Sequence, residues 1–150
     1  MLFSDLQSAI VTRLESDTAY LAEPGKAVTV LAENALDLLS EYEKAISKLG
    51  MAVIISTPRV TPTERVDLAN VSVSIAICEH VSLNRATSGT QKPAIDVGAG
   101  IMAMLRNWTP DENVWAPFLF LDFARVGQDE TSGCDLWSID FQTQTMLDAA

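Results

Sequence analysis

One short stretch of the chain has the spacing of a dinucleotide-binding turn. Residues 96–105 read DVGAGIMAML, in which Gly98, Gly100 and Ala103 fit the pattern G-x-G-x-x-A. Asp122 ends the apolar run FLFL about 20 residues further on, where such enzymes place the acid that binds the ribose. These residues could hold a nicotinamide dinucleotide, provided that the surrounding elements position them as such an enzyme requires.

The elements around the glycines do not fit that requirement. The turn must follow a buried strand, whereas the preceding residues read TQKPAID, and Pro93 and Asp96 are unfavourable in a central strand. We therefore expect Gly98 and Gly100 to lie within a helix. Close packing against a sheet would there offset the roughly 1 kcal/mol by which each glycine weakens a helix. Asp122 is then expected on a strand, facing solvent or a neighbouring subunit.

The other residues with catalytic potential do not form a recognisable active-site motif. The chain has no G-x-S-x-G, no phosphate-binding P-loop and no H-E-x-x-H. His80 is the single histidine, and its neighbour Glu79 would point to the opposite face of a strand. Cys78 and Cys134 lack metal-binding spacing and are expected to be small buried hydrophobes. We expect no enzymatic activity, no cofactor and no metal.

The composition indicates an acidic globular protein. Its 150 residues are 48% hydrophobic and 20% charged, which favours a single domain over residues 1–150. No apolar run approaches the ~20 residues that span a bilayer, and no signal peptide or membrane association is expected. The net charge is −10, and from Asn107 onward eight acids face one base. Such a surface repels nucleic acid. Charge alone does not distinguish a soluble surface from one past which DNA slides.

The first third of the chain predicts two helices. Ser4 and Gln7 have the spacing of a capping box, and apolar residues at helical spacing favour a helix over about 4–16. A second amphipathic stripe predicts a helix from about residue 34, ended by Gly50. Within the intervening segment 17–33, the run AVTVLA is either a short strand or the lead-in to the second helix.

The remainder predicts strands around one further helix. The run MAVIIST is a short strand, followed by a turn-prone connection between Pro58 and Pro62. Residues 67–80 (DLANVSVSIAICEH) alternate large apolar with small side chains, and the small face should let a helix pack closely. The other expected elements are a helix over about 93–108, with Trp108 in the core, and a hairpin of strands over 115–126 and 134–146. The order favours an α+β fold: a mostly antiparallel sheet of about four strands with helices packed on one face.

The segment VSLNRATSGTQKP, residues 81–93, has no periodicity and predicts a long polar loop. Asn84, Arg85 and Lys92 are its candidate assembly-contact residues. The alternative interpretation is a mobile surface loop.

The second half of the chain resembles a known family. An alternating strand (NVSVSIAICEH) leads to the polar loop, a helix ending in tryptophan and proline (AGIMAMLRNWTP), and a long hairpin (PFLFLDFARVGQDETSGCDLWSIDFQTQTM). This arrangement resembles the tail terminator (tail-completion) proteins of long-tailed bacteriophages, including the Mu-like branch, over residues 35–147. The resemblance implies a non-enzymatic virion protein. It would form a six-membered ring on the head-proximal end of the tail tube, end tube elongation and join the tail to the neck.

The resemblance also implies partners. They are further copies of the chain in a hexameric ring, the tail tube protein and a neck or head-completion protein, with genomic DNA passing through unbound. Asp129, Glu130 and Asp135 are the candidates for an acidic lumen or surface. Assembly would occur in the bacterial cytoplasm, and the protein would reside at the tail–neck junction. The alternatives are another head–tail connector, the cap of an injection machine, a monomeric interaction module, and a dinucleotide-binding enzyme built on GAGIMA.

Overall fold

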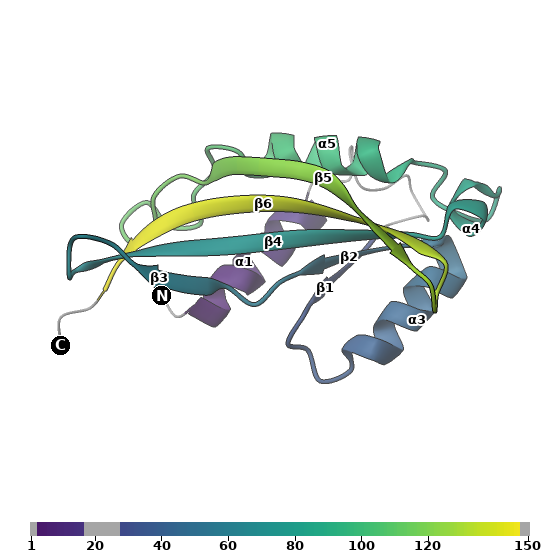
Figure 1. Ribbon diagram of the computed structural model, residues 1–150, viewed down its shortest axis with the longest axis horizontal. Helices are drawn as coiled ribbons and strands as arrows, with labels where there is room; N and C mark the ends of the chain where they lie inside the picture. The colour runs from purple at the N-terminus through teal and green to yellow at the C-terminus, as the bar shows by residue number, and fades with distance from the viewer. Residues whose placement is uncertain (1–2, 17–27, 148–150) are drawn as a thin grey trace.

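A computed structural model of the protein describes residues 3–16 and 28–147 (Figure 1). Part of the ambiguous segment 17–33 therefore lies outside the described residues. The elements in chain order are α1 (Phe3–Ser16), β1 (Thr29–Ala32), α3 (Leu38–Leu49), β2 (Met51–Ile55), β3 (Arg59–Pro62), β4 (Leu68–Glu79), α4 (Val81–Arg85), α5 (Ala94–Leu105), β5 (Leu119–Asp129) and β6 (Cys134–Met146). None of the described helices is long and apolar enough to cross a membrane.

The strands form one sheet in the order β1-β2-β4-β6-β5, and β3 pairs with the part of β4 that β2 leaves free. Every neighbouring pair is antiparallel except β1 and β2. The prediction of an α+β fold with a mostly antiparallel sheet is confirmed. The sheet has six strands rather than about four, because TVLA of the ambiguous segment forms β1 and because the expected connection after Pro58 forms β3, which ends at Pro62.

The edge position of β3 explains why a segment that follows one proline and ends in another can be a strand. Arg59–Pro62 pairs only with β4, so backbone groups on its other side need no strand partner. Proline lacks an N–H and is tolerated on such edges, whereas it disrupts a central strand. The prolines led us to predict an irregular connection at these residues, and that prediction is wrong because the segment pairs with β4.

One face of the sheet is apolar and carries the core. Alternate residues of β4 and β6 point to it, and the helices α1 and α5 cover it (Figure 1). The buried residues that these two strands contribute are Val71, Val73, Ile75, Ile77, Ile139 and Phe141. The helices add side chains that are entirely buried, among them Leu6, Ile10, Ile101 and Leu105.

The opposite face carries the small residues of β4, and α5 does not pack against it. Gly98 lies inside α5, as expected, but a Cβ there would run into the ring of Phe123 on the aromatic side of the sheet. The glycine therefore allows close approach to an aromatic ring. The helix that meets the small-residue face is α3, whose Tyr42 contacts Cys78 at the end of β4, so helices lie on both faces of the sheet rather than on one. Because Gly98 lies in the second turn of α5, it does not form a strand-to-helix phosphate turn.

Three local predictions need correction. Gln7 does not complete a capping box: its side chain is buried and donates to the carbonyls of Ile55 (3.0 Å) and Ser56 (3.2 Å), which ties α1 to β2. Trp108 is half-buried at the margin of the core, edge-on to Phe118 with ring centroids 5.4 Å apart. The strand expected from residue 115 begins at Leu119, and Trp115 makes an isolated bridge to β6.

Gly50 ends α3 as predicted and also holds α4 in place. Its φ of 75° is left-handed, and its N–H donates to the carbonyl of Ile46 (2.9 Å). The N–H of His80, which precedes α4, donates to the Gly50 carbonyl (2.8 Å). A Cβ at Gly50 would overlap the backbone of Leu83 and Asn84, so only glycine fits between the two helices.

We predict that Gly50→Ala destabilises the protein far more than Gly133→Ala. Both glycines have a left-handed φ (75° and 72°), so each alanine adds about 1 kcal/mol of backbone strain. At Gly133 a Cβ meets nothing closer than His80 Nε2 at 4.0 Å, whereas at Gly50 it collides with backbone that cannot move alone. Urea unfolding of both variants measures the difference, which we expect to exceed about 2 kcal/mol. Equal losses would show that strain alone selects glycine at Gly50.

Candidate assembly surface

The segment predicted as a polar loop contains a short helix and a buried polar cluster. Val81–Arg85 forms α4, and the Nδ1 atom of His80 accepts from the N–H of Leu83 at its start (3.4 Å). His80 is thus a helix cap. The prediction that 81–93 is one irregular loop is wrong, because capping and the contact with Gly50 stabilise a turn of helix that shows no sequence periodicity.

Glu79 is the centre of this cluster. Its side chain is only 3% exposed, and it accepts from Asn84 Nδ2 (2.5 Å), Arg85 Nε (3.2 Å) and the N–H of Ala94 (3.4 Å). A buried carboxylate is strongly unfavourable unless it is paired and hydrogen-bonded, and these three donors meet that need. The carboxylate thereby joins the end of β4, α4 and the start of α5.

Asn84 is the connector of the cluster and is not at the surface. Besides Glu79, its amide donates to the carbonyl of Lys92 (2.8 Å) and accepts from the hydroxyl of Thr90. The residue is entirely buried, so its candidacy as a contact residue does not agree with the structure. Arg85 is about half exposed and remains a candidate, as does Lys92, which is partly buried.

We predict that Asn84→Ala lowers the free energy of unfolding by about 2–3 kcal/mol, because it removes three hydrogen bonds of the buried cluster, to Glu79, Thr90 and the carbonyl of Lys92. The control variant Lys44→Ala removes an exposed donor from the exposed Glu41 and should lower it by less than about 1 kcal/mol. Chemical denaturation with far-ultraviolet circular dichroism distinguishes them. An Asn84→Ala protein of unchanged stability would restore the original interpretation of Asn84 as a surface contact.

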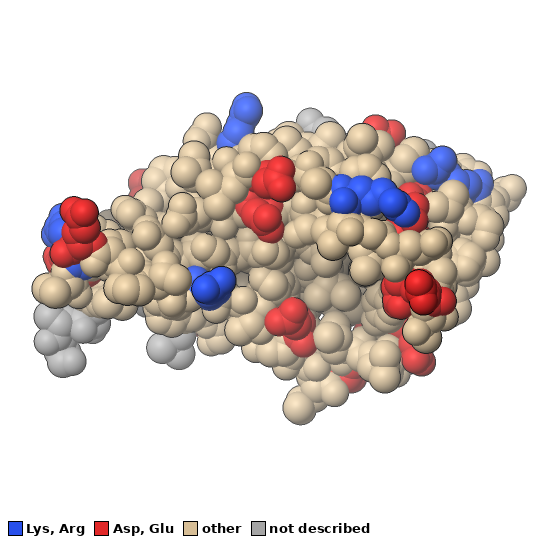
Figure 2. All heavy atoms as spheres, in the orientation of Figure 1, with Lys and Arg blue, Asp and Glu red and all other residues tan. Residues whose placement is uncertain are grey.

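The three candidate acids lie at the end of the β5–β6 hairpin, and two of them are engaged locally. Asp129 accepts from the hydroxyl of Ser132 (2.8 Å) and from the N–H of Thr131 (3.1 Å), and these bonds lower the pKa of its carboxyl. Asp135 pairs with Arg125 (2.9 Å). Glu130 is exposed. Acidic side chains on the face shown in Figure 2 form separate patches rather than one stripe.

Two buried cysteines contact the same tyrosine side chain near this end of the hairpin. Cys78 and Cys134 are free and buried, and both interact with the hydroxyl of Tyr42 on α3. Burial raises the pKa of the Cys78 thiol to about 11, and burial also raises the pKa of Tyr42. The expectation that both cysteines are buried is confirmed. Within residues 3–16 and 28–147, no three His, Cys, Asp or Glu side chains are placed to hold a metal ion.

Folded protein should resist thiol alkylation. At pH 8 a thiol with a pKa near 11 is about 0.1% thiolate, against roughly a quarter for an ordinary cysteine. We therefore expect Cys78 to react with iodoacetamide more than about 100-fold more slowly in the folded than in the unfolded protein. Because the folded-state pKa is the higher one, stability should fall as pH rises above about 8.5. Mass spectrometry of tryptic peptides measures the rate, and rapid native labelling of Cys78 would contradict its burial.

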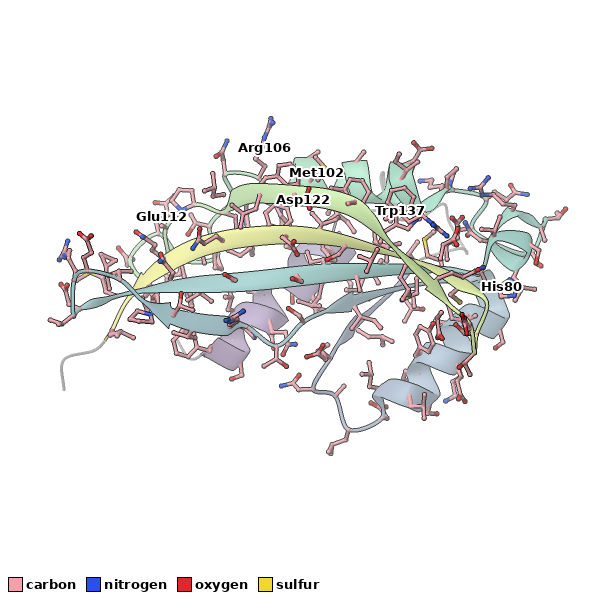
Figure 3. All side chains as sticks on the ribbon, viewed as in Figure 1. His80, Met102, Arg106, Glu112, Asp122 and Trp137 are labelled. Atoms are coloured by element: carbon pink, nitrogen blue, oxygen red, sulfur yellow. The ribbon has the colours of Figure 1, made fainter. Side chains whose placement is uncertain are left out.

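The sheet face opposite the core is polar, and the described residues leave it uncovered except at the end where Tyr42 of α3 lies against the two buried cysteines. Asp122 and Asp140 lie directly opposite each other on β5 and β6. Asp140 accepts from the hydroxyls of Ser74 (2.7 Å) and Ser138 (3.2 Å), whereas no described residue donates to Asp122, which is exposed (Figure 3). Like charges across a strand pair are destabilising, so a cation from outside the subunit would relieve this pair. The expectation that Asp122 is an exposed strand residue is confirmed.

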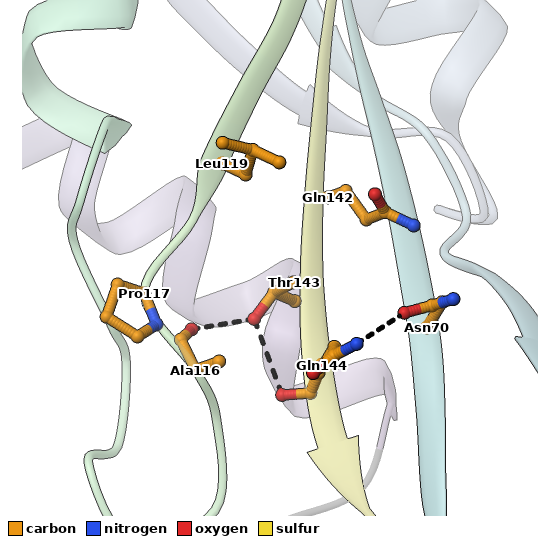
Figure 4. A pocket seen from close by; sticks show the side chains of 7 residues that line it. All are labelled: Asn70, Ala116, Pro117, Leu119, Gln142, Thr143 and Gln144. Carbon is orange, nitrogen blue, oxygen red and sulfur yellow. Dashed lines mark hydrogen bonds between the residues drawn. The ribbon is translucent and has the colours of Figure 1, made fainter. Parts of the chain in front are cut away.

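A shallow hollow of about 190 Å³ lies on the same face, where β5 begins beside β6. The residues that line it are Asn70, Ala116, Pro117, Leu119, Gln142, Thr143 and Gln144 (Figure 4). The Gln144 amide donates to Asn70 (2.9 Å), and no charged group lines the hollow. Neutral amides beside an exposed leucine suit contact with polypeptide, since they can bond backbone groups without a charged partner.

Comparison with solved structures finds chains of similar fold. The fold is similar to that of a chain in the virion of a native gene transfer agent particle, with a TM-score of 0.63 over 95% of both chains at 13% identity. At this identity the likeness concerns the fold. No family model matches the sequence, and no curated protein matches it.

Proposed function

We propose that the protein is a structural, non-enzymatic component of a phage-like virion. The observation that carries the proposal is the fold likeness, which extends over 95% of both chains to a protein of a gene transfer agent virion. The uncovered polar sheet face and the free strand edges support it, because such surfaces are normally protected unless they pair with another chain. The glycine motif gives no support to the dinucleotide alternative, since its first glycine lies within α5.

Within a virion, the role that fits best is that of tail terminator. A tube grows by open-ended contacts between unlike surfaces, so its cap must match the last tube subunit and present a different surface outward. The uncovered polar sheet face and the helix-covered side of this subunit differ in that way. We propose a hexameric ring at the tail–neck junction, with tube and neck proteins as partners and DNA passing through. The net charge of −10 is compatible with passage of DNA without binding.

Deletion of the gene in its native source tests the proposal. If the protein ends tail growth, electron microscopy of negatively stained particles should show overlong or irregular tails that fail to join heads. Plasmid-borne wild-type gene should restore normal particles. Glu112→Arg, a charge reversal at an exposed residue, is a further control that should restore them equally well.

Two other outcomes have defined meanings. Tails of normal length beside filled, unjoined heads would make the protein a neck subunit. Normal, infectious or transfer-competent particles after deletion would contradict a virion role and favour the monomeric interaction module.

A further inference from the structure

The sheet has free edges on both sides. On one side, β5 pairs only with β6, so one side of an eleven-residue strand has no partner strand among the described residues. On the other side, β3 pairs only with β4. Unpaired edges are templates for another chain, and soluble proteins usually keep them short, charged or covered.

The β5 edge combines apolar side chains with an unpartnered charge. Leu119, Leu121 and Val126 are 59%, 50% and 68% exposed. Leu121 and Val126 sit at the two irregularities in the pairing with β6, where bulges change the direction of the strand. Asp122, next to the first bulge, is exposed on the open face and has no partner among the described residues.

The β3 edge has complementary features. Arg59 is exposed, and none of the described residues pairs with its guanidinium. It lies opposite Ser72, two residues from Ser74, which bonds the open-face residue Asp140. Side chains two apart on a strand share a face, so Arg59 lies on the same face as Asp122. The neighbouring Val60 is 43% exposed.

Strand directions allow these two edges to meet. β4 is antiparallel to both β3 and β6, and β6 is antiparallel to β5, so β3 and β5 run in opposite directions. If one subunit is placed beside another with its sheet continued edge to edge, β5 of the first is antiparallel to β3 of the second. The register that brings Asp122 beside Arg59 also brings Leu121 beside Val60.

We propose that copies of this chain associate head to tail, with the β5 edge of one subunit on the β3 edge of the next and an ion pair between Asp122 and Arg59. The contact joins unlike surfaces, so its repetition generates a ring when the rotation closes. The inference deepens the assembly part of the proposed function and rests on it. It relieves the repulsion between Asp122 and Asp140 and covers apolar side chains on both edges.

A charge exchange in the purified full chain tests the contact. Asp122→Arg and Arg59→Asp should each weaken self-association at least about tenfold, and the double variant should recover most of it. Analytical ultracentrifugation over a concentration series measures the association, and circular dichroism verifies that each variant is folded. The matched controls are Arg106→Asp and Glu112→Arg, which reverse exposed charges outside both edges (Figure 3) and should change nothing.

Disulfide trapping tests the geometry independently. Subunits carrying Asp122→Cys mixed with subunits carrying Arg59→Cys should form a cross-linked dimer under mild oxidation, and the double variant should form a ladder of multimers. The native cysteines are buried and should give little background. Dimers formed by Asp122→Cys alone would overturn the inference in favour of β5 pairing with β5.

The remaining outcomes are also decisive. Wild-type protein that stays monomeric at all concentrations, or charge reversals without effect on association, would overturn the inference. Confirmed edge pairing together with normal particles after gene deletion would overturn the virion role and leave the contact intact. Overlong tails after deletion together with a failed charge exchange would leave the virion role and overturn this contact.

Discussion

The structure depends on one long antiparallel pairing between β4 and β6. Leu68–Glu79 matches Asp135–Met146 without a break, from Leu68 opposite Met146 to Glu79 opposite Asp135. Because side chains alternate along both strands, this register places the valines and isoleucines of β4 and the aromatic residues of β6 on one face. A shift by one residue would move all of them to the other face, so the pairing determines where every helix can pack.

The two faces that result have different roles. The apolar face is filled by α1 and α5 and by the segment around Phe118, and it stabilises the fold. The other face carries serines, amides and the Asp122–Asp140 pair, which contribute little to a core. Burial beneath the helices of the same subunit explains the apolar composition of the first face. The second, with its unpaired edges, is better explained by contacts that the subunit makes with other chains, which is the basis of the functional proposal.

The features that could be predicted from the sequence are those that depend on local patterns of residues. The bounds of β4 and β6, the Gly50 cap of α3 and the helical environment of Gly98 follow from alternation, turn chemistry and context. Features that depend on tertiary contact could not be predicted in this way. In the sequence Gln7 has the spacing of a capping box, but in the fold it donates to a carbonyl of β2. Asn84 lies in a segment without periodicity, and only the fold brings Glu79 and Thr90 into contact with it. β3 escaped prediction because prolines disfavour strands in general, while its edge position is a property of the sheet.

The long central pairing also has a consequence for how the chain reaches this fold. Its partners are far apart in sequence, since β4 ends at Glu79 and β6 begins at Cys134. Sheets built on such non-local contacts fold slowly, typically in milliseconds to seconds, because a large loop must close before the ladder can form. During that interval β4 has an unpaired edge and an uncovered face of valine and isoleucine, which makes it the segment most exposed to mispairing between nascent subunits. The rate at which the chain completes its own ladder therefore sets how concentrated its unfolded form can become before aggregation competes with assembly.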